Sequence, residues 1–309
     1  MDIRHLRYFL AVADAGHMTR AAEGLGIQQP PLSQQIKALE RELGMVLFRR
    51  HPKGVALTDE GRLFEAEARS QLANLAAMQA RMGRVARGEL GGLNIGFTSS
   101  AAAHGFTPDL LRACRRDHPG VRLAISENNA ADIIEAVAAG RLHCGLIRVP
   151  VAQPEALLFE TLLREPVVVA LPIDHRLVAA GGLRPAPVEL ASLRDDDFIL
   201  VRRPGAPGLY ANLLARCEQQ GFTPRIAAEV ERMVTSLNLV AAGVGVAVVP
   251  ASMQGWHAHA VAYLKLASNV QLDAPLTLVY RQAEASGVMR QFIALARATA
   301  TRIQSESGE

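Results

Sequence analysis

The chain has 309 residues, of which 50% are hydrophobic and 20% are charged. This length predicts about two domains, because single hydrophobic cores stop growing near about 250–300 residues, and the half-apolar composition excludes an intrinsically disordered chain. The formal net charge is only +3, but residues 1–90 hold 13 Lys and Arg against 10 Asp and Glu whereas residues 91–309 hold 20 of each, so we expect a phosphate-contacting surface in the first ninety residues.

Two short helices are predicted at the start of the chain. Apolar residues recur at helical spacing over residues 3–13, and Gly16 closes this first helix. The second helix has small apolar residues at positions 21–22, which allow a close helix crossing. We expect Thr19 to cap its start and Gly26 to end it.

A third helix and a hairpin follow. Prolines at positions 30–31 are tolerated only in the first turn of a helix, so they predict the start of a helix over residues 32–43 that Gly44 ends. Two short apolar runs flank the turn residues 52–54 and predict a β-hairpin between residues 47 and 58.

One long amphipathic helix is predicted over residues 59–87, which contain no proline. Its apolar positions, spaced by threes and fours, are Leu63, Ala66, Leu72, Leu75, Met78, Met82 and Val85. A helix of this length usually buries its apolar stripe against a second copy of itself. Glycines 88, 91 and 92 then mark a hinge.

After the hinge, strands and helices alternate. We expect strands at 93–97, 121–126 and 144–149, with helices at 108–114 and 131–139 between them. This order predicts a parallel sheet with helices on both faces, that is, a doubly wound α/β fold. Strands at 167–171, 198–201, 226–230 and 244–249 form a second α/β unit, and a strand at 276–280 and a helix at 287–303 close the chain.

The strongest functional signal is the helix–turn–helix spacing of the second and third helices. Glutamine can pair with adenine in the major groove, and lysine or serine can hold phosphate. The alternative is a polar helical hairpin without a ligand, which the basic hairpin downstream disfavours. The candidate DNA-binding residues are Thr19, Arg20, Gln28, Gln29, Pro30, Pro31, Ser33, Gln34, Lys37, Arg49, Arg50 and Lys53.

A specific set of motifs accompanies this spacing: Leu6-Arg7-Tyr8-Phe9, Ala21-Ala22, Gln29-Pro30-Pro31-Leu32-Ser33, Leu39-Glu40, Leu43-Gly44, Leu47-Phe48-x-Arg50 and Leu57-Thr58-x-x-Gly61. Through them the chain resembles LysR-type transcriptional regulators over essentially its whole length. The resemblance implies a winged helix–turn–helix (residues 1–58), a dimerising linker helix (59–89) and a two-lobed α/β effector domain like a periplasmic binding protein (90–309). Lobe I would span about 90–161 and 267–309, and lobe II about 162–266.

The same resemblance implies a homotetramer, a dimer of dimers, that bends promoter DNA and changes its grip when a small inducer binds. Many relatives carry arginine after the serine of the third helix, where this chain has Gln34, so one base contact is expected to differ.

The inducer site can also be approached from physical chemistry. Thr98, Ser99 and Ser100 follow the first strand of the α/β domain and lead into a helix, where hydroxyls and free N–H groups favour a carboxylate. The alternative is that Thr98 or Ser99 only caps that helix. Asn128 and Asn129 follow the second strand, and ligands of open α/β sheets bind beyond strand carboxyl ends, so both turns should line one crevice.

Two arginine positions could meet the inducer. Arg148, after a buried strand, is either a carboxylate partner or a surface cation. Arg202 on the facing lobe either meets a second carboxylate or lies in a solvated loop. The stretch 145–148 and the stretch 239–252 are similar to the branch that senses benzoate, muconate and chlorocatechol breakdown products. We therefore expect a small acidic, aromatic-derived effector, with a non-aromatic metabolite as the alternative.

Other functions find little support. Ser99, His104 and Asp109 suggest a hydrolase triad, but no G-x-S-x-G elbow, phosphate-binding loop or zinc helix occurs. Three cysteines without C-x-x-C spacing argue against a disulfide framework and a cysteine zinc site, and only one lies in the second lobe, where a redox sensor needs two. We expect no cofactor, no metal, no membrane anchor and a cytoplasmic protein.

Overall fold

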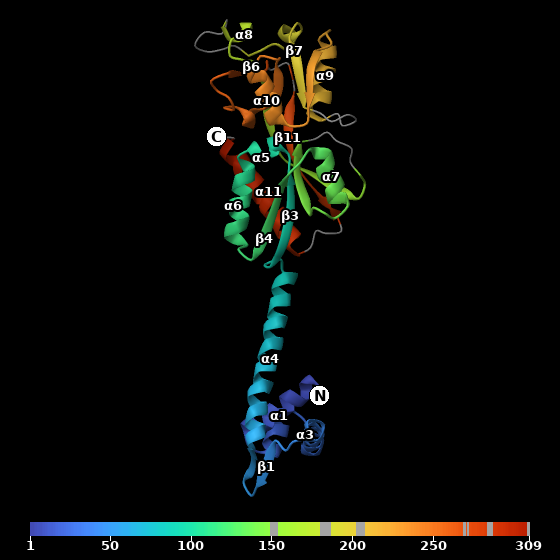
Figure 1. Cartoon of the computed structure of the whole chain (residues 1–309), viewed down its shortest axis with the longest axis vertical. Helices are drawn as coiled ribbons and strands as arrows, with labels where there is room; N and C mark the ends of the chain where they lie inside the picture. Colours follow the sequence, from blue (N-terminus) through green and yellow to red (C-terminus); the bar gives the residue numbers. More distant parts are fainter. Residues whose placement is uncertain are drawn as a thin grey trace. The chain divides into compact units, whose positions relative to one another are not determined.

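The structure, a computed structural model, describes residues 1–148, 154–179, 187–201, 208–267, 270, 272–282 and 287–307. The chain divides into two compact units, Met1–Arg84 and Val85–Glu309. Each unit has hydrophobic clusters of its own, and each is described by itself below. Figure 1 labels the helices and strands of both units.

The first unit is a winged helix–turn–helix followed by a long helix. Its elements are α1 (Ile3–Ala15), α2 (Met18–Gly24), α3 (Gln29–Leu43), β1 (Phe48–His51), β2 (Gly54–Leu57) and α4 (Asp59–Ala86), the last of which ends at the start of the second unit. The three predicted helices, the hairpin and the long helix are confirmed. Gly16 and Gly44 end α1 and α3 in the left-handed conformation, with φ of 59° and 69°, as glycine at these positions predicts.

One predicted cap is wrong. His17, and not Thr19, caps α2: the His17 Nδ1 accepts a hydrogen bond from the backbone N–H of Thr19 at 3.2 Å. The chain leaves α1 at Gly16 and is extended at His17, so α2 begins at Met18. Thr19 is then already the second residue of the helix and cannot be its cap.

Phe9 organises the core of the first unit. Its ring lies 5.0 Å from that of Phe48 and 4.8 Å, edge-on, from that of Phe64, which ties α1 to the wing and to α4. The Glu40 carboxylate accepts hydrogen bonds from the backbone N–H groups of Leu47 and Phe48, at 2.8 and 3.2 Å, and fixes the start of the wing to α3.

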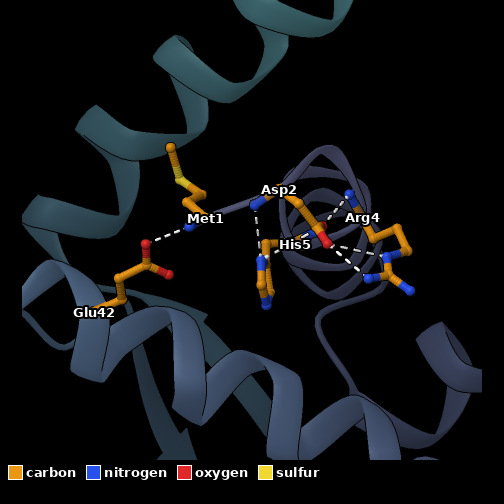
Figure 2. Close-up of polar contacts among 5 residues, drawn as sticks. All are labelled: Met1, Asp2, Arg4, His5 and Glu42. Carbon is orange, nitrogen blue, oxygen red and sulfur yellow. Dashed lines mark hydrogen bonds and ion pairs between the residues drawn. The ribbon is translucent and has the colours of Figure 1, made fainter.

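The start of α1 is held by a capping box (Figure 2). Asp2 accepts hydrogen bonds from the backbone N–H groups of Arg4 and His5, while the His5 Nδ1 accepts from the Asp2 N–H. The side-chain hydrogen bond from Arg4 lowers the pKa of Asp2 to about 2, so the cap stays ionised. Figure 2 also shows the amino group of Met1 paired with Glu42 on α3.

The second unit is a mixed α/β fold. Its strands are β3 (Gly91–Phe97), β4 (Val121–Glu127), β5 (Cys144–Arg148), β6 (Leu157–Pro172), β7 (Asp197–Val201), β8 (Arg225–Val230), β9 (Ala247–Pro250), β10 (Val261–Lys265) and β11 (Asp273–Arg281). Its helices are α5 (Ser99–Ala103), α6 (Phe106–Asp117), α7 (Ala130–Ala138), α8 (Arg176–Ala179), η1 (Leu190–Leu193), α9 (Gly208–Gln219), α10 (Met233–Ala241), η2 (Ala251–Met253) and α11 (Gly287–Ser307).

The main sheet has the order β10-β6-β11-β5-β3-β4, with β9 also paired to β6. The predicted parallel arrangement is confirmed for β4, β3 and β5. No direction was predicted for β11, which pairs antiparallel with both β5 and β6. Of the strands predicted between residues 167 and 249, β7 and β8 pair in parallel.

Two core regions share the long strand β6. In the first core region, α6 and α11 cover one face of the sheet and α7 covers the other, as Figure 1 shows. In the second core region, α9 packs on one face of the strands and α10 on the other. Along β6, residues 167, 169 and 171 face the α9 side, and 168 and 170 face the α10 side. A strand buried on both faces reads as a continuous apolar run.

The predicted hinge is packed and not free. Gly88 has a φ of +77°, and a Cβ placed on it would lie 2.5 Å from the carbonyl of Gly287, at the first turn of α11. The Gln291 amide donates a hydrogen bond to the Arg87 carbonyl at 3.2 Å, and Gly91 packs on Val288. The end of α4 and the start of α11 are therefore in backbone contact.

We predict that Gly88→Ala destabilises the second unit more than Gly221→Ala does. Both glycines have a φ of +77°, but nothing lies within 4 Å of a Cβ at Gly221, so both variants lose about 1–2 kcal/mol to the left-handed backbone and only Gly88→Ala adds a clash of about 1–3 kcal/mol. Denaturant unfolding followed by the fluorescence of the single tryptophan, Trp256, measures both. Equal losses would contradict a close-packed junction.

Candidate nucleic-acid interface and effector site

The helix α3 presents one buried and one exposed face. Its first turn holds two prolines, which have no N–H to satisfy, and Gln28 precedes it with no side-chain cap. Leu32, Ile36 and Leu39 are buried. The predicted DNA-binding side chains Thr19, Arg20, Gln28, Gln29, Pro30, Pro31, Gln34, Lys37, Arg49, Arg50 and Lys53 are exposed, and Ser33 is half-buried.

The wing is joined to α3 through two predicted DNA-binding residues. The Arg50 guanidinium donates a hydrogen bond to the Ser33 hydroxyl at 3.5 Å. In the hairpin, Arg49 pairs with Ala56 and Arg50 with Val55, so the two neighbouring arginines point to opposite faces. The structure therefore brings β1 of the wing beside the first turns of α3.

Arg20 has a structural partner. Its guanidinium donates to the Ala15 carbonyl at 2.8 Å, where it satisfies one of the carbonyls at the end of α1. Part of its hydrogen-bonding capacity is used in this way, whereas the side chain remains exposed.

The three predicted hydroxyl residues after β3 have different roles. Thr98 caps α5, its hydroxyl accepting from the Ala101 N–H at 3.3 Å. The Ser99 hydroxyl instead accepts from the Met233 N–H, at the first residue of α10, at 3.3 Å. Ser100 is buried and uses its carbonyl, which accepts from Arg148. The capping alternative thus applies to Thr98 and not to Ser99.

The two asparagines after β4 also have different roles. Asn129 caps α7: its side-chain oxygen accepts from the Asp132 N–H at 2.9 Å, and its amide donates to the Asp132 carboxylate at 2.8 Å. Asn128 is exposed; its N–H donates to the Phe97 carbonyl at 3.0 Å, which places it next to the end of β3. The turns after β3 and β4 are therefore adjacent, as predicted.

Arg148 is buried, and its charge is already paired with a carboxylate. It is 7% exposed and donates to the Ala274 carbonyl at 2.8 Å, to the Ser100 carbonyl at 3.2 Å and to the Glu165 carboxylate. Glu165 in turn accepts from the N–H and the hydroxyl of Ser252, at 2.8 and 3.0 Å. Burial lowers the pKa of Arg148, and the adjacent carboxylate opposes that shift.

His104 lies near this charged pair. Burial lowers its pKa, the Arg148 charge adds to that effect and the Glu165 charge opposes it. Its Nδ1 accepts a hydrogen bond from the Phe106 N–H at 3.0 Å, at the start of α6. These surroundings favour the neutral form of the imidazole.

Among the described residues, two polar contacts join the turns of the first core region to the start of α10 in the second. One is the Ser99–Met233 hydrogen bond, and the other is an ion pair between Arg232 and Glu127, at 3.3 Å, across the ends of α10 and β4. The turns that were predicted to line a crevice thus meet the N-terminal end of α10.

Arg202 lies outside the described residues. In the described ranges, no helix combines the length and apolar character that a membrane crossing requires, and no three His, Cys, Asp or Glu side chains are grouped to hold a metal. Cys114, Cys144 and Cys217 are free and buried, and burial raises the pKa of each thiol.

The hydrolase triad does not assemble. Ser99 accepts from Met233, the Nδ1 of His104 accepts from Phe106, and Asp109 pairs with Arg112 and Arg302. Each of the three residues therefore has a separate partner, and they do not contact one another as a triad.

Sequence reasoning missed Glu165 and Ser252, the partners that neutralise Arg148. A carboxylate that interrupts the apolar run before residue 167 is a signal that could have identified Glu165, since a charge inside a buried strand requires a partner. Nothing local to Ser252 indicates its role.

The chain is similar to known proteins along its whole length. A model of the LysR substrate binding domain matches residues 86–301, and a model of bacterial regulatory helix-turn-helix proteins of the lysR family matches residues 3–62. The transcriptional regulator AlsR of Bacillus subtilis is 35% identical over all of both chains, and BudR of Raoultella terrigena is 36% identical over 95% of this chain and 99% of its own.

The chain is also similar to solved structures of full-length regulators. Full-length CbnR in complex with its target DNA has a TM-score of 0.74 and 27% identity, covering 97% of this chain and all of CbnR. Full-length BenM has a TM-score of 0.59 and 31% identity, covering all of this chain and 98% of BenM.

We predict that Glu165→Ala lowers the free energy of unfolding by about 3–5 kcal/mol, because it leaves the buried Arg148 charge without its partner. The exposed pair Arg164–Asp273, on the adjacent residue of β6, is the matched control, and Asp273→Ala should cost less than about 1 kcal/mol. Urea unfolding of both variants measures the difference. Similar losses in the two variants would contradict a structural role for the buried pair.

Proposed function

The chain belongs to the LysR family of bacterial transcriptional regulators, which are DNA-binding proteins and not enzymes, and from this premise we propose that a small carboxylate effector changes its grip on promoter DNA. In this proposal residues 1–58 bind DNA, residues 59–89 join two subunits, and residues 90–309 bind the effector. The observation that carries the DNA-binding part is the exposed polar face of α3, which the Arg50–Ser33 hydrogen bond joins to the basic wing.

For DNA, we propose that α3 enters the major groove and that the wing contacts the backbone beside it. Gln29 and Gln34 would read base edges, and Lys37, Arg49 and Lys53 would hold phosphates. Their exposure and the excess positive charge of the first ninety residues support these roles.

Phosphate contacts and base contacts can be separated with two variants of α3. Lys37→Ala should lower affinity equally for all duplexes and reduce the slope of log K against log[salt] by about 0.9, the value for one lost phosphate contact. Gln34→Ala should keep the slope and change the preferred sequence. Titrations at several salt concentrations and selection from random duplexes measure these effects. An unchanged slope in Lys37→Ala, or an unchanged consensus in Gln34→Ala, would contradict the assigned role.

For the effector, we propose that it binds where the turns after β3 and β4 meet the start of α10. The Ser99 hydroxyl and the N–H groups of the α10 first turn would hold a carboxylate, since helix N-termini carry partial positive charge. Among the described residues, the Arg148 Nε is buried without a hydrogen-bond partner, which supports a polar ligand group nearby. Asn128 would line the same site, whereas Thr98, Ser100 and Asn129 would shape it through their structural contacts.

We propose an aromatic-derived acid as the effector, with a non-aromatic metabolite as the second candidate. Membership of the family leaves both open, because relatives at 33–36% identity include regulators as differently named as AlsR, BudR, IlvR and CatR. The neutralisation of Arg148 by Glu165 favours an effector with one carboxylate at this position, since a second negative charge would face Glu165.

A thermal-shift screen of the full chain against aromatic acids, muconates and small aliphatic acids tests this proposal. A ligand at 100 times its Kd should stabilise the second unit by about 2.7 kcal/mol. Ser99→Ala should lose this shift and keep operator binding, whereas Ser305→Ala, an exposed serine on α11, should keep both. Loss of operator binding in Ser99→Ala would indicate a structural role, and a shift only with aliphatic acids would exclude the aromatic class.

For assembly, we propose that α4 pairs with α4 of a second copy and that pairs of dimers form a tetramer. Leu63, Met78, Met82 and Val85 are exposed on α4, which leaves an apolar stripe for a partner helix to cover.

We predict that Met78→Lys weakens self-association, because it places a charge in the centre of that stripe. Gln79→Lys adds the same charge on an exposed neighbouring position and should leave association unchanged. Sedimentation velocity over a range of concentrations measures the change. Equal behaviour of the two variants would exclude α4 as the pairing surface.

A further inference from the structure

A hollow lies along the exposed side of the second half of α3. Its volume is about 600 Å³, and its walls are Gln34, Lys37, Glu40 and Arg41 of the helix together with Gly44, Met45 and Val46 of the turn that follows. Two of these residues, Gln34 and Lys37, belong to the proposed DNA-binding face; the others were not predicted to bind DNA.

The hollow is positively charged. Lys37 and Arg41 lie one helical turn apart, and neither forms an ion pair within the described part of the chain. The Arg41 Nε donates to the Lys37 carbonyl at 3.3 Å, which orients the guanidinium and leaves its outer N–H groups for a ligand. The one acid in the wall, Glu40, is held by the backbone N–H groups of Leu47 and Phe48.

The hollow continues the DNA-binding face. Gln34, Lys37 and Arg41 are spaced i, i+3 and i+7 and therefore share one side of the helix. Seven residues of helix rise about 10 Å, so Arg41 extends this face by one turn beyond Lys37. An extended ligand that contacts Gln34 and Lys37 can therefore also contact Arg41 along the same side of the helix.

Met45 and Val46, the apolar side of the hollow, can contact the sugar of a nucleotide. Met45 is 40% exposed and Val46 is 60% exposed, and a deoxyribose can pack on such side chains while its phosphate meets the cations. The carbonyls at the end of α3 repel an anion, so the phosphate must lie nearer to Lys37 and Arg41 than to Gly44.

We propose that this hollow takes a phosphodiester of the bound DNA backbone and that Arg41 is a phosphate-contacting residue at the far end of the α3 face. The inference rests on the proposed DNA-binding role of α3 and adds a contact that fixes how far the helix lies along the duplex. An acidic protein segment, including one from a second copy, is the competing occupant that the experiment separates.

The test uses the full chain with its selected operator duplex and a random duplex, between 50 and 200 mM salt. Arg41→Ala should reduce the salt slope by about 0.9 for both duplexes, and Arg41→Lys should retain it. Arg4→Ala, which removes an equal charge from the exposed Arg4–Asp2 pair in the same unit, should leave the slope unchanged.

A second pair of variants tests the wall. Val46→Glu should weaken binding to both duplexes several-fold relative to the neutral Val46→Gln, and thermal melts should show both variants folded, because the side chain is exposed. An unchanged slope in Arg41→Ala, or equal affinities of Val46→Glu and Val46→Gln, would overturn the inference while DNA binding stands. Weakened self-association in Arg41→Ala without a change in DNA affinity would also overturn it, in favour of a protein occupant. Loss of all salt-dependent duplex binding by the wild type would instead refute the proposed function.

Discussion

The buried ion pair between Arg148 and Glu165 is the interaction on which the second unit depends. It joins β5 to β6, and through the Ser100 and Ala274 carbonyls and Ser252 it also reaches α5, β11 and η2. Two charges removed from water are stable only if each finds its partners. The geometry of the turns after β3 and of the segment after β9 is therefore set by the same group, so the proposed effector site and the scaffold share their central contact.

Local signals in the sequence predicted most of the fold. In the first unit, helical periodicity predicts the helices. Gly16, Gly44 and the two prolines of α3 mark helix ends, and each of these signals acts within a few residues. The direction of β11 was not predictable in this way, since its pairing with β5 joins residues more than a hundred positions apart. The cap of α2 was missed because a histidine ring nitrogen took the place usually held by a hydroxyl or carboxylate.

The candidate sites were predictable to different degrees. On α3, exposure follows directly from helical period, so the polar face could be listed from the sequence, although Arg41 was overlooked because it lies past the start of the helix. Around β3 and β5, residue types alone did not tell a ligand-facing group from a structural one. Thr98 and Asn129 became caps, and Arg148 became half of a buried pair with a residue 17 positions away.

The contact between Gly88 and Gly287 closes almost the whole second unit into one loop of chain. Arg87 and Gln291, which flank the contact and share a hydrogen bond, are 204 positions apart, and a Cβ on Gly88 would lie 2.5 Å from the Gly287 carbonyl. The entropy lost in closing a loop grows only slowly with its length. The close packing of two glycine backbones, and not the length of the intervening chain, therefore decides whether the two ends of this unit stay together.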